Sequence, residues 1–369
     1  MAVAGLLIAI SSPLFGAVAD YEGRRKPWIA IFAGIAIIAG FFLWFSKPSP
    51  DYVMWTLSWV VLGVIGVEVS VVFYNVMLRD LAPKNYIGRI SGWGWGLGYF
   101  GGLTCLVIAL LVFVHGDTRW LGLNRQTFEH IRITGPFVSI WYFIFAIPLF
   151  VWTKDRSSSG ISYRKALSDG ANQLLETLRK LPRYKEILKF LIARMIYTDG
   201  LNTIFAFGGI YAAGTFGMSF TEVIQFGISL NVAAGIGAIG FAWLDDYIGP
   251  KPTILISLLI MFLSGVGILI VHSKLAFWIL GMVLSLCVGP VQAASRSLIA
   301  RAAPPELVAE MFGLYAFSGK ATAFIGPWLV GAFTLFFDSQ RIGMSSVLAF
   351  LLVGGIILCF VRAPTTPAD

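Results

Sequence analysis

Four ionisable residues stand inside long apolar stretches of this sequence, where an uncompensated charge is costly. Asp199 and Lys320 lie well within two such stretches, and Glu68 and Arg296 lie in two others. In lipid, ionisable groups of this kind pair with one another or mark the pathways of solutes, protons and ions. The chemistry that these residue types indicate is the reversible binding of a charged group.

Asp199 and Lys320 are expected at similar depth. Each lies about twelve or thirteen residues into its stretch, roughly 18 Å at the rise of an α-helix, which is near the middle of a bilayer. Two alternatives are open: a structural ion pair, or a solute whose carboxylate binds Lys320 while Asp199 holds an amino group or a proton. Arg296 is close to the end of its stretch, so its guanidinium is expected to extend to the membrane surface.

Uncharged polar side chains accompany these residues, and interhelical hydrogen bonds explain them as well as a solute does. They are Tyr74, Asn75, Asn202 and Gln292. No metal-ligand spacing and no nucleophile–base pattern is found, so we expect neither enzyme activity nor a metal or other cofactor. The three cysteines fall inside apolar stretches, which is typical of small packing residues.

Composition indicates that these stretches lie in lipid. Hydrophobic residues make up 57% of the chain, charged residues 12%, and the mean hydropathy is +0.81. A soluble domain cannot bury so much apolar surface, so the bilayer is the expected solvent and the first expected partner. The net charge is +8, and its basic residues are distributed by membrane side, as the positive-inside rule requires. The charge therefore gives no reason to expect a nucleic-acid partner.

Eleven apolar stretches are long enough to cross a membrane, because a spanning helix needs about 20 residues. They cover residues 1–19, 27–46, 53–78, 90–114, 133–153, 187–211, 220–244, 252–271, 275–300, 307–337 and 342–361. Alternating sides along the chain places seventeen lysines and arginines on the side of the C-terminus and six on the other. The positive-inside rule therefore predicts a cytoplasmic C-terminus.

Two short loops between stretches share the pattern D-Y-x-G with basic residues behind it. The residues of interest are Gly16, Asp20, Gly23, Arg24, Arg25 and Lys26 in the first, and Asp246, Gly249 and Lys251 in the second. Gly23 is free to take the positive φ that a tight turn requires. Asp20, at a helix end, can accept hydrogen bonds from its loop or from the N-terminus of a neighbouring helix.

Residues 154–186 form one long internal loop. Apolar residues recur in it at helical spacing, opposite a polar face: Leu167, Ala171, Leu174, Leu175, Leu178 and Leu181. The pattern predicts an amphipathic helix on the cytoplasmic membrane surface, with a solvated linker as the alternative. The linker would separate an N-terminal helical bundle at 1–153 from a C-terminal one at 187–369.

The two bundles repeat each other. Three matches share an offset of 221 residues: Ala82-Pro83 with Ala303-Pro304, Gly92 with Gly313, and Gly98 with Gly319. The D-Y-x-G loop follows the second stretch of the C-terminal bundle but the first stretch of the N-terminal bundle. We therefore expect that one helix, about 40 residues with its loop, is absent from the N-terminus, leaving eleven of twelve.

The first loop, G-x-x-x-D-x-x-G-R-R-K, resembles the cytoplasmic signature loop of the major facilitator superfamily, although Tyr21 stands where a basic residue is common. Three further stretches resemble the vacuole-effluxer family, the autophagy-related branch of that superfamily. They are FYNVMLRDLAPKNYIGRISGWGWGLGYFGG at 73–102, YTDG at 197–200 and SRSLIARAAPPELVAEMFGLYAFSGKATAFIGP at 295–327. The resemblance covers essentially the whole chain.

This resemblance implies an all-α membrane protein of two parallel, pseudo-repeated helical bundles with a solute site between them near the bilayer midplane. It also implies alternating-access transport of a small polar solute. Fungal members are associated with amino-acid efflux. Glu68 would lie on a cavity-lining helix, and proton coupling through Asp199 or Glu68 would be the simplest energy source. The short loops are typical of a bacterial member, so the inner membrane is the expected location.

Two other functions are open at this stage. One is a receptor or scaffold that kept the fold without transporting, and the other is export of drugs or other metabolites. Gly98 stands where the antiporter pattern G-P-x-x-G-G of drug exporters has its proline, which counts against drug antiport. Gly96–Gly101 fits the dinucleotide pattern G-x-G-x-x-G but has no preceding strand, so no nucleotide cofactor is expected.

Overall fold

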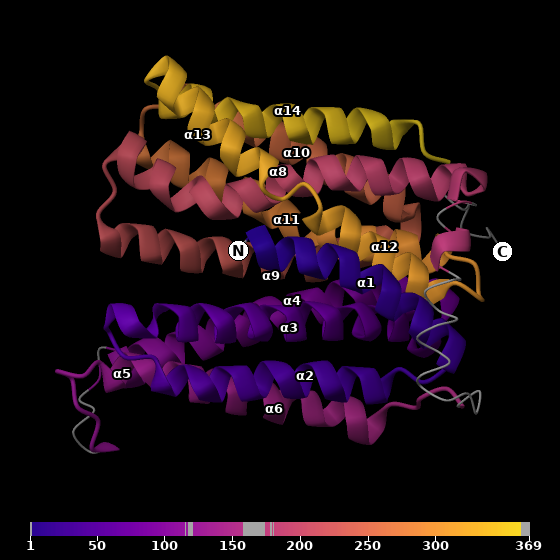
Figure 1. Cartoon of the computed structure of the whole chain (residues 1–369). Coiled ribbons are helices and arrows are strands. Elements are labelled where there is room, and N and C mark those ends of the chain that lie inside the picture. The colour runs from indigo at the N-terminus through magenta and orange to yellow at the C-terminus, as the bar shows by residue number, and fades with distance from the viewer. Residues whose placement is uncertain are drawn as a thin grey trace.

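The computed structural model of the chain describes residues 2–114, 116, 121–157, 174–177, 179 and 181–362. The regular elements of this part are helices, without a strand (Figure 1). An N group contains α1 (Ala2–Glu22), α2 (Lys26–Phe42), α3 (Val53–Leu81), α4 (Ile87–Ile108), α5 (Glu129–Arg132) and α6 (Thr134–Trp152). A C group contains α8 (Lys185–Phe216), α9 (Phe220–Ile248), α10 (Pro250–Ile270), α11 (Lys274–Ala302), α12 (Val308–Lys320), α13 (Ile325–Phe337) and α14 (Gln340–Cys359).

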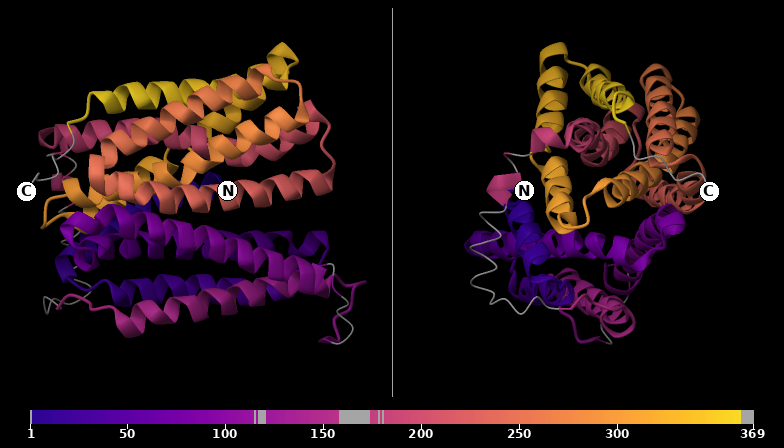
Figure 2. Two further views of the ribbon diagram at one scale, coloured as in Figure 1. Left: turned by 180° about the vertical axis from the view of Figure 1, so that it is seen from behind. Right: turned by 90° about the vertical axis from the view of Figure 1, so that its right-hand side faces the viewer.

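The two groups lie side by side with their long helices roughly parallel (Figure 1). Figure 2 shows them end-on in its right-hand view, with the indigo-to-magenta helices on one side and the rose-to-yellow helices on the other. Two packed pairs join the groups, α1 with α12 and α4 with α9. The described loop residues at 23–25, 82–83, 153–157, 181–184, 249 and 303–307 share one end of the bundle with Val361 (Figure 1). We call it the linker end and the opposite one the far end.

Turn chemistry sets several helix ends. Gly23 and Gly249 have φ values of 95° and 91°, which a residue with a Cβ rarely adopts, so each allows a tight turn between two long helices. Gly217 ends α8 with φ of 60°. Ser219 then starts α9 with a capping box, in which its hydroxyl accepts from the backbone of Glu222 and the Glu222 carboxylate accepts from the backbone of Ser219.

Nine helical segments in the described part are long and apolar enough to cross a membrane. The eleven expected spans include two more, α1 and α8. In α1 the apolar part is only Leu7–Asp20, and α8 carries ionisable residues such as Arg194 and Asp199 that lower its hydropathy. Most of the expected amphipathic helix at 154–186 lies outside the described residues.

The expected single helix at 307–337 is interrupted, which corrects the sequence-based prediction. α12 ends at Lys320 and α13 begins at Ile325. Two backbone hydrogen bonds span the gap. The Ala323 N–H donates to the Lys320 carbonyl (3.3 Å), and the Ile325 N–H donates to the Thr322 carbonyl (2.8 Å). The break begins in the Ser-Gly-Lys-Ala-Thr stretch, and its residues Ala321 to Ala323 are partly buried.

Glycines permit the close approach of the two groups. A Cβ on Gly92 of α4 would lie 2.4 Å from the Ala238 carbonyl oxygen of α9, and a Cβ on Gly313 of α12 would lie 2.5 Å from the Ser12 carbonyl oxygen of α1. A Cβ on Gly16 would lie 2.4 Å from the Ala309 carbonyl oxygen. These neighbours are backbone atoms that cannot rotate away, so the glycines set the separation of the helices.

We predict that Gly92→Ala lowers stability by about 1–3 kcal/mol, because the new methyl group forces α4 away from α9. Gly98→Ala on the same helix is the matched control, because a Cβ there meets no atom within 4 Å. The measurement is the midpoint of thermal unfolding in detergent. Equal midpoints for the two variants would contradict this account of the packing.

Candidate functional site

Asp20 of α1 links the N group to the C group at the linker end. Its Oδ2 accepts the backbone N–H of Glu310, in the first turn of α12, at 2.8 Å. Its Oδ1 accepts from Arg25 Nη2 at 3.0 Å, and both side chains of this ion pair are buried. The hydrogen bonds expected for Asp20, to its own loop and to a neighbouring helix N-terminus, are therefore both present.

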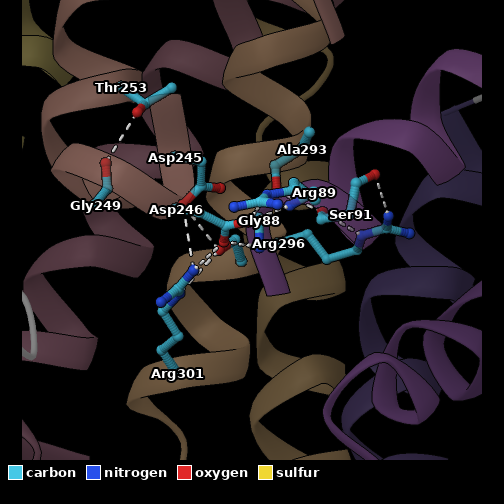
Figure 3. A network of polar contacts seen from close by, with 11 residues as sticks. Gly88, Arg89, Ser91, Asp245, Asp246, Gly249, Thr253, Ala293, Arg296 and Arg301 are labelled. Atoms are coloured by element: carbon cyan, nitrogen blue, oxygen red, sulfur yellow. Dashed lines mark hydrogen bonds and ion pairs between the residues drawn. The ribbon is translucent and has the colours of Figure 1, made fainter. Parts of the chain in front are cut away.

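Asp246 of α9 links the C group to the start of α4 in the N group. Its two carboxylate oxygens accept the backbone N–H groups of Gly88 (2.8 Å) and Arg89 (3.1 Å) at the start of α4. Arg89 Nε (3.1 Å) and Arg301 Nη2 (2.9 Å) also donate to this carboxylate. Figure 3 shows Asp246 between the N group residues Gly88 and Arg89 and the C group residue Arg301.

The two contacts are related by the same offset as the sequence repeat. Glu310, whose N–H binds Asp20, lies 221 residues after Arg89, whose N–H binds Asp246. Each aspartate thus places a negative charge at the positive end of a helix from the other group. We call the pair the crossed caps. They differ in side-chain support, because Asp246 has two arginine partners and Asp20 has one.

The basic residues of the two loops mostly bind helix ends. Lys26 Nζ donates to the carbonyls of Phe150 (2.9 Å) and Thr153 (2.6 Å) at the C-terminus of α6. Lys251 Nζ donates to those of Cys359 (2.8 Å) and Val361 (2.7 Å) at the C-terminus of α14. A cation is favoured at such C-terminal carbonyls. Arg24 is exposed.

Asp155 was not among the residues that the sequence singled out. Its carboxylate accepts the N–H groups of Arg25 (2.9 Å) and Lys26 (3.0 Å) and caps α2. A lone acid beside the basic residues of the linker was the available signal.

Arg296 does not extend to the membrane surface, which corrects the expectation for this residue. Its side chain is only 4% exposed. Its guanidinium donates to Ser91 Oγ (2.9 Å), to the Ser91 carbonyl (2.7 Å) and to Asn75 Oδ1 (3.1 Å), all in the N group (Figure 3 shows Ser91). The rings of Tyr74 and Trp95 flank it at 5.7 and 5.9 Å. The reason is that α11 faces α3 and α4 at this height, so protein rather than lipid surrounds the side chain.

Lys320 does not pair with Asp199, which corrects the expected pairing of these two residues. Lys320 Nζ instead contacts Glu68 Oε1 of α3 at 2.5 Å, and both side chains are 32% exposed. The predicted depths of Lys320 and Asp199 gave no information on direction around the helix. α12 packs against α3, so the Lys320 side chain reaches Glu68 in the N group.

Asp199 binds the other side of the helix break. Its Oδ2 accepts the N–H of Gly326, in the first turn of α13, at 3.2 Å. Asp199 is 2% exposed, and its Oδ1 is buried without a hydrogen-bond partner. A Cβ on Gly326 would lie 2.0 Å from Thr203 Oγ1, so α13 begins in close contact with α8.

Some of the remaining polar candidates lie at the boundary between the two groups, and Asn202 lies beside the helix break. Tyr99 donates to Gln292 Oε1 at 3.0 Å between α4 and α11, and Tyr74 and Asn75 are near Arg296. Asn202 Nδ2 donates to the Gly319 carbonyl at 3.4 Å beside the break. Glu68, Lys320, Tyr74, Asn75, Gln292 and Arg296 therefore share the boundary between the groups, while Asp199 and Asn202 belong to the C group interior.

A cavity of about 320 Å³ lies within the C group, away from most of these residues. Side chains of α8, α9, α10, α11 and α14 line it, and they are mainly apolar. Asn231, Ser285 and Tyr211 add polar atoms, and Tyr99 of α4 brings the cavity to the boundary between the groups. None of the eight solute or coupling candidates from the sequence lines it. Among the described residues, no three His, Cys, Asp or Glu side chains cluster as a metal site would require.

The family profile described as "Vacuole effluxer Atg22 like" matches residues 84–366, and that of the "Major Facilitator Superfamily" matches residues 1–106. The MFS-type transporter YxiO of Bacillus subtilis (strain 168) is 26% identical, over 99% of this chain and 84% of that protein. Autophagy-related protein 22-1 of Penicillium rubens is 24% identical over 67% of this chain and 44% of its own length. The chain thus spans less than half of that fungal relative.

Solved structures resemble the whole fold. The proton:xylose symporter XylE has a TM-score of 0.76 at 14% identity, covering 98% of this chain and 85% of that one. The E. coli fucose:proton symporter FucP has a TM-score of 0.73 at 13% identity, covering 98% and 92%. At this identity the likeness concerns the fold alone. It confirms the coarser part of the expected fold class, an all-helical fold like that of major facilitator transporters.

We predict that Asp20→Asn and Asp246→Asn each favour separation of the groups at the linker end. Each substitution removes the negative charge from a helix cap, a loss of about 1 kcal/mol. The measurement is the distance between spin labels at the exposed positions Lys84 and Glu306, in the loops before α4 and α12. The fraction of long distances should rise in both variants.

The exposed carboxylate of Asp51, in the loop between α2 and α3 at the far end, provides the control. Asp51→Asn should leave the distances as they are in the unsubstituted chain. Distances that do not respond to either cap variant would show that the crossed caps do not hold the linker end closed.

Proposed function

Because this chain belongs to the vacuole-effluxer family of the major facilitator superfamily, we propose that it moves a small polar solute across the membrane by alternating access. The proposed solute class is amino acids and the proposed direction is efflux. The proposed location is the inner membrane of a bacterium, with the linker end and the C-terminus in the cytoplasm. We also propose that α1 and α8 span the bilayer, which gives eleven spans.

The crossed caps are the observation that carries this proposal. Asp20 and Asp246 join the two groups at the same end of the bundle, each through a helix N-terminus of the opposite group. A carboxylate that binds a helix N-terminus loses this contact when the helices separate. The contact therefore favours one arrangement of the groups over another, as a gate must. A scaffold without transport would have no need of two such separable contacts at one end.

The units that move are proposed to be residues 1–153 and 187–369, with 154–186 as the linker. In the arrangement described here the linker end is held together by the crossed caps and by Arg296, which donates three hydrogen bonds to Ser91 and Asn75. The reverse arrangement would require these bonds to be replaced by water or solute. The solute is proposed to bind on the far-end side of Arg296.

Glu68 and Lys320 are the proposed solute contacts. They form an ion pair across the two groups, and each remains about one-third exposed, so a charged solute can reach and replace either partner. A zwitterion presents a carboxylate for Lys320 and an ammonium for Glu68. Gln292 and Tyr99, which bond to each other across the same boundary, are proposed to contact the solute's uncharged parts.

We predict that the double variant Glu68→Gln with Lys320→Met folds but transports amino acids about tenfold or more slowly, a loss of ~1.4 kcal/mol or more. The single variants each leave one charge without its partner, so both are expected to express less well. The measurement is uptake of a radiolabelled amino-acid mixture into proteoliposomes, beside the yield of folded protein in the membrane.

Lys274 and Glu222 form a comparable ion pair at the far end, at 3.3 Å and well exposed, which provides the matched control. Glu222→Gln with Lys274→Met should leave uptake unchanged. Full uptake by the Glu68 and Lys320 double variant would show that this pair serves structure alone. Absence of uptake by the unsubstituted chain for every amino acid would remove amino acids as the solute class.

A further inference from the structure

The interrupted helix is held on both sides by α8. Before the break, Arg194 Nη1 of α8 donates to the Tyr315 carbonyl (2.5 Å) and to Ser318 Oγ (2.8 Å), and its guanidinium stacks 3.5 Å from the Tyr315 ring centre. After the break, Asp199 of α8 caps α13 through the Gly326 N–H. One helix therefore sets the relative position of α12 and α13.

The contacts of α8 with α12 and with α13 differ in chemistry. Arg194 is always charged and has three separate contacts with α12. Asp199 can gain a proton, and its contact with α13 is a hydrogen bond from one backbone N–H. Its second oxygen is buried without a partner. In the described part of the chain, no lysine, arginine or histidine nitrogen lies within 4.0 Å of this carboxylate.

Ionised Asp199 is therefore a buried charge that only the N-terminus of α13 compensates, and a helix N-terminus supplies about half a unit charge. Glu68, the other acid proposed for coupling, is neutralised by Lys320 at 2.5 Å. The charged form of Glu68 has a full counter-charge and that of Asp199 does not. Of the two, only Asp199 is placed so that taking up a proton removes an unbalanced charge.

We propose that Asp199 is the group that binds and releases a proton in the transport cycle, an inference that rests on the proposed function. The step is the addition of a proton from water to the carboxylate, which forms one O–H bond and breaks none in the protein. A neutral carboxyl is a weaker cap than an anion, so the hold of α8 on α13 loosens. Lys320, at the end of α12, then transmits the change to Glu68 in the N group.

The charged groups near Asp199 on the surrounding elements have partners of their own. On α8 the nearby ones are Arg194, described above, and Tyr197, whose hydroxyl bonds to Ser295 Oγ at 2.7 Å. α13 carries no ionisable residue. The others lie on α9, α11, α12 and α14 and have partners of their own: Glu222, Asp245, Asp246, Lys274, Arg296, Arg301, Glu310, Tyr315, Lys320 and Arg341.

The test uses the chain in lipid nanodiscs, with spin labels at Lys84→Cys and Glu306→Cys and the three natural cysteines replaced. Distances are measured from pH 5 to pH 8 without added solute. In this background the populations of short and long distances should change with pH. Asp199→Asn should abolish that change and leave one pH-independent distribution. Asp199→Glu, which keeps an ionisable group, should restore a pH response with a shifted midpoint.

Glu222→Gln, which removes an exposed carboxylate of α9 at the far end, is the matched control and should retain the pH response. A pH response that survives in Asp199→Asn would overturn the proposal, whether or not it is lost in Glu68→Gln. A response to sodium at constant pH, in place of a response to pH, would also overturn it. If Asp199→Asn does not fold, the midpoint shift in Asp199→Glu decides, and an unshifted midpoint counts against Asp199.

The proposed function fails in a different way. Asp246→Asn with the same labels tests whether the linker end can open at all. If the label distances change in that variant while those of the unsubstituted chain do not respond to pH, the proposed proton site is wrong and the proposal of alternating access stands. If no variant and no pH changes the distances, alternating access itself is contradicted.

Discussion

This architecture depends on one kind of contact, in which a carboxylate of one helix group binds the first backbone N–H groups of a helix in the other group. The first N–H groups of a helix have no partner within it, and lipid offers none. Asp20 and Asp246 satisfy these groups and add charge where the helix dipole favours it. The contact is strong only at close range, so it also requires the glycines that bring α1 to α12 and α4 to α9. Packing and electrostatics therefore act together at one end of the molecule.

The interrupted helix uses the same chemistry inside the C group. Asp199 caps α13 as Asp20 caps α12, but the cap joins two helices of one group and, among the described residues, has no arginine nitrogen within 4.0 Å. α12 ends at Lys320, and this lysine pairs with Glu68 of the N group. The interrupted helix therefore contacts a buried acid after the break and forms an ion pair with the N group before it.

The polar boundary and the apolar cavity of the C group are separate but adjacent. Arg296, Gln292 and the Glu68–Lys320 pair lie between the groups, whereas the cavity of about 320 Å³ lies among helices of the C group. Tyr99 belongs to both, because it lines the cavity and donates to Gln292. A solute held by its charges at the boundary would therefore have an apolar volume beside it, which is the usual division of labour in a small-molecule site.

The sequence by itself determined the features that depend on local composition and spacing. Apolar stretches predicted the helices, Gly23 with Asp20 predicted a capped turn, and the 221-residue offset related Gly92 to Gly313. Tertiary structure decided what depends on rotation about a helix axis and on neighbouring helices. Residue counts placed Asp199 and Lys320 at one depth, but depth does not specify direction around the helix axis. Lys320 points toward Glu68, which is 252 residues away in the chain. Arg296 was expected at the surface because it is near a helix end, yet it is buried because another helix covers it. A partner that comes from a distant part of the chain leaves no local pattern, and for that reason only the fold could show it.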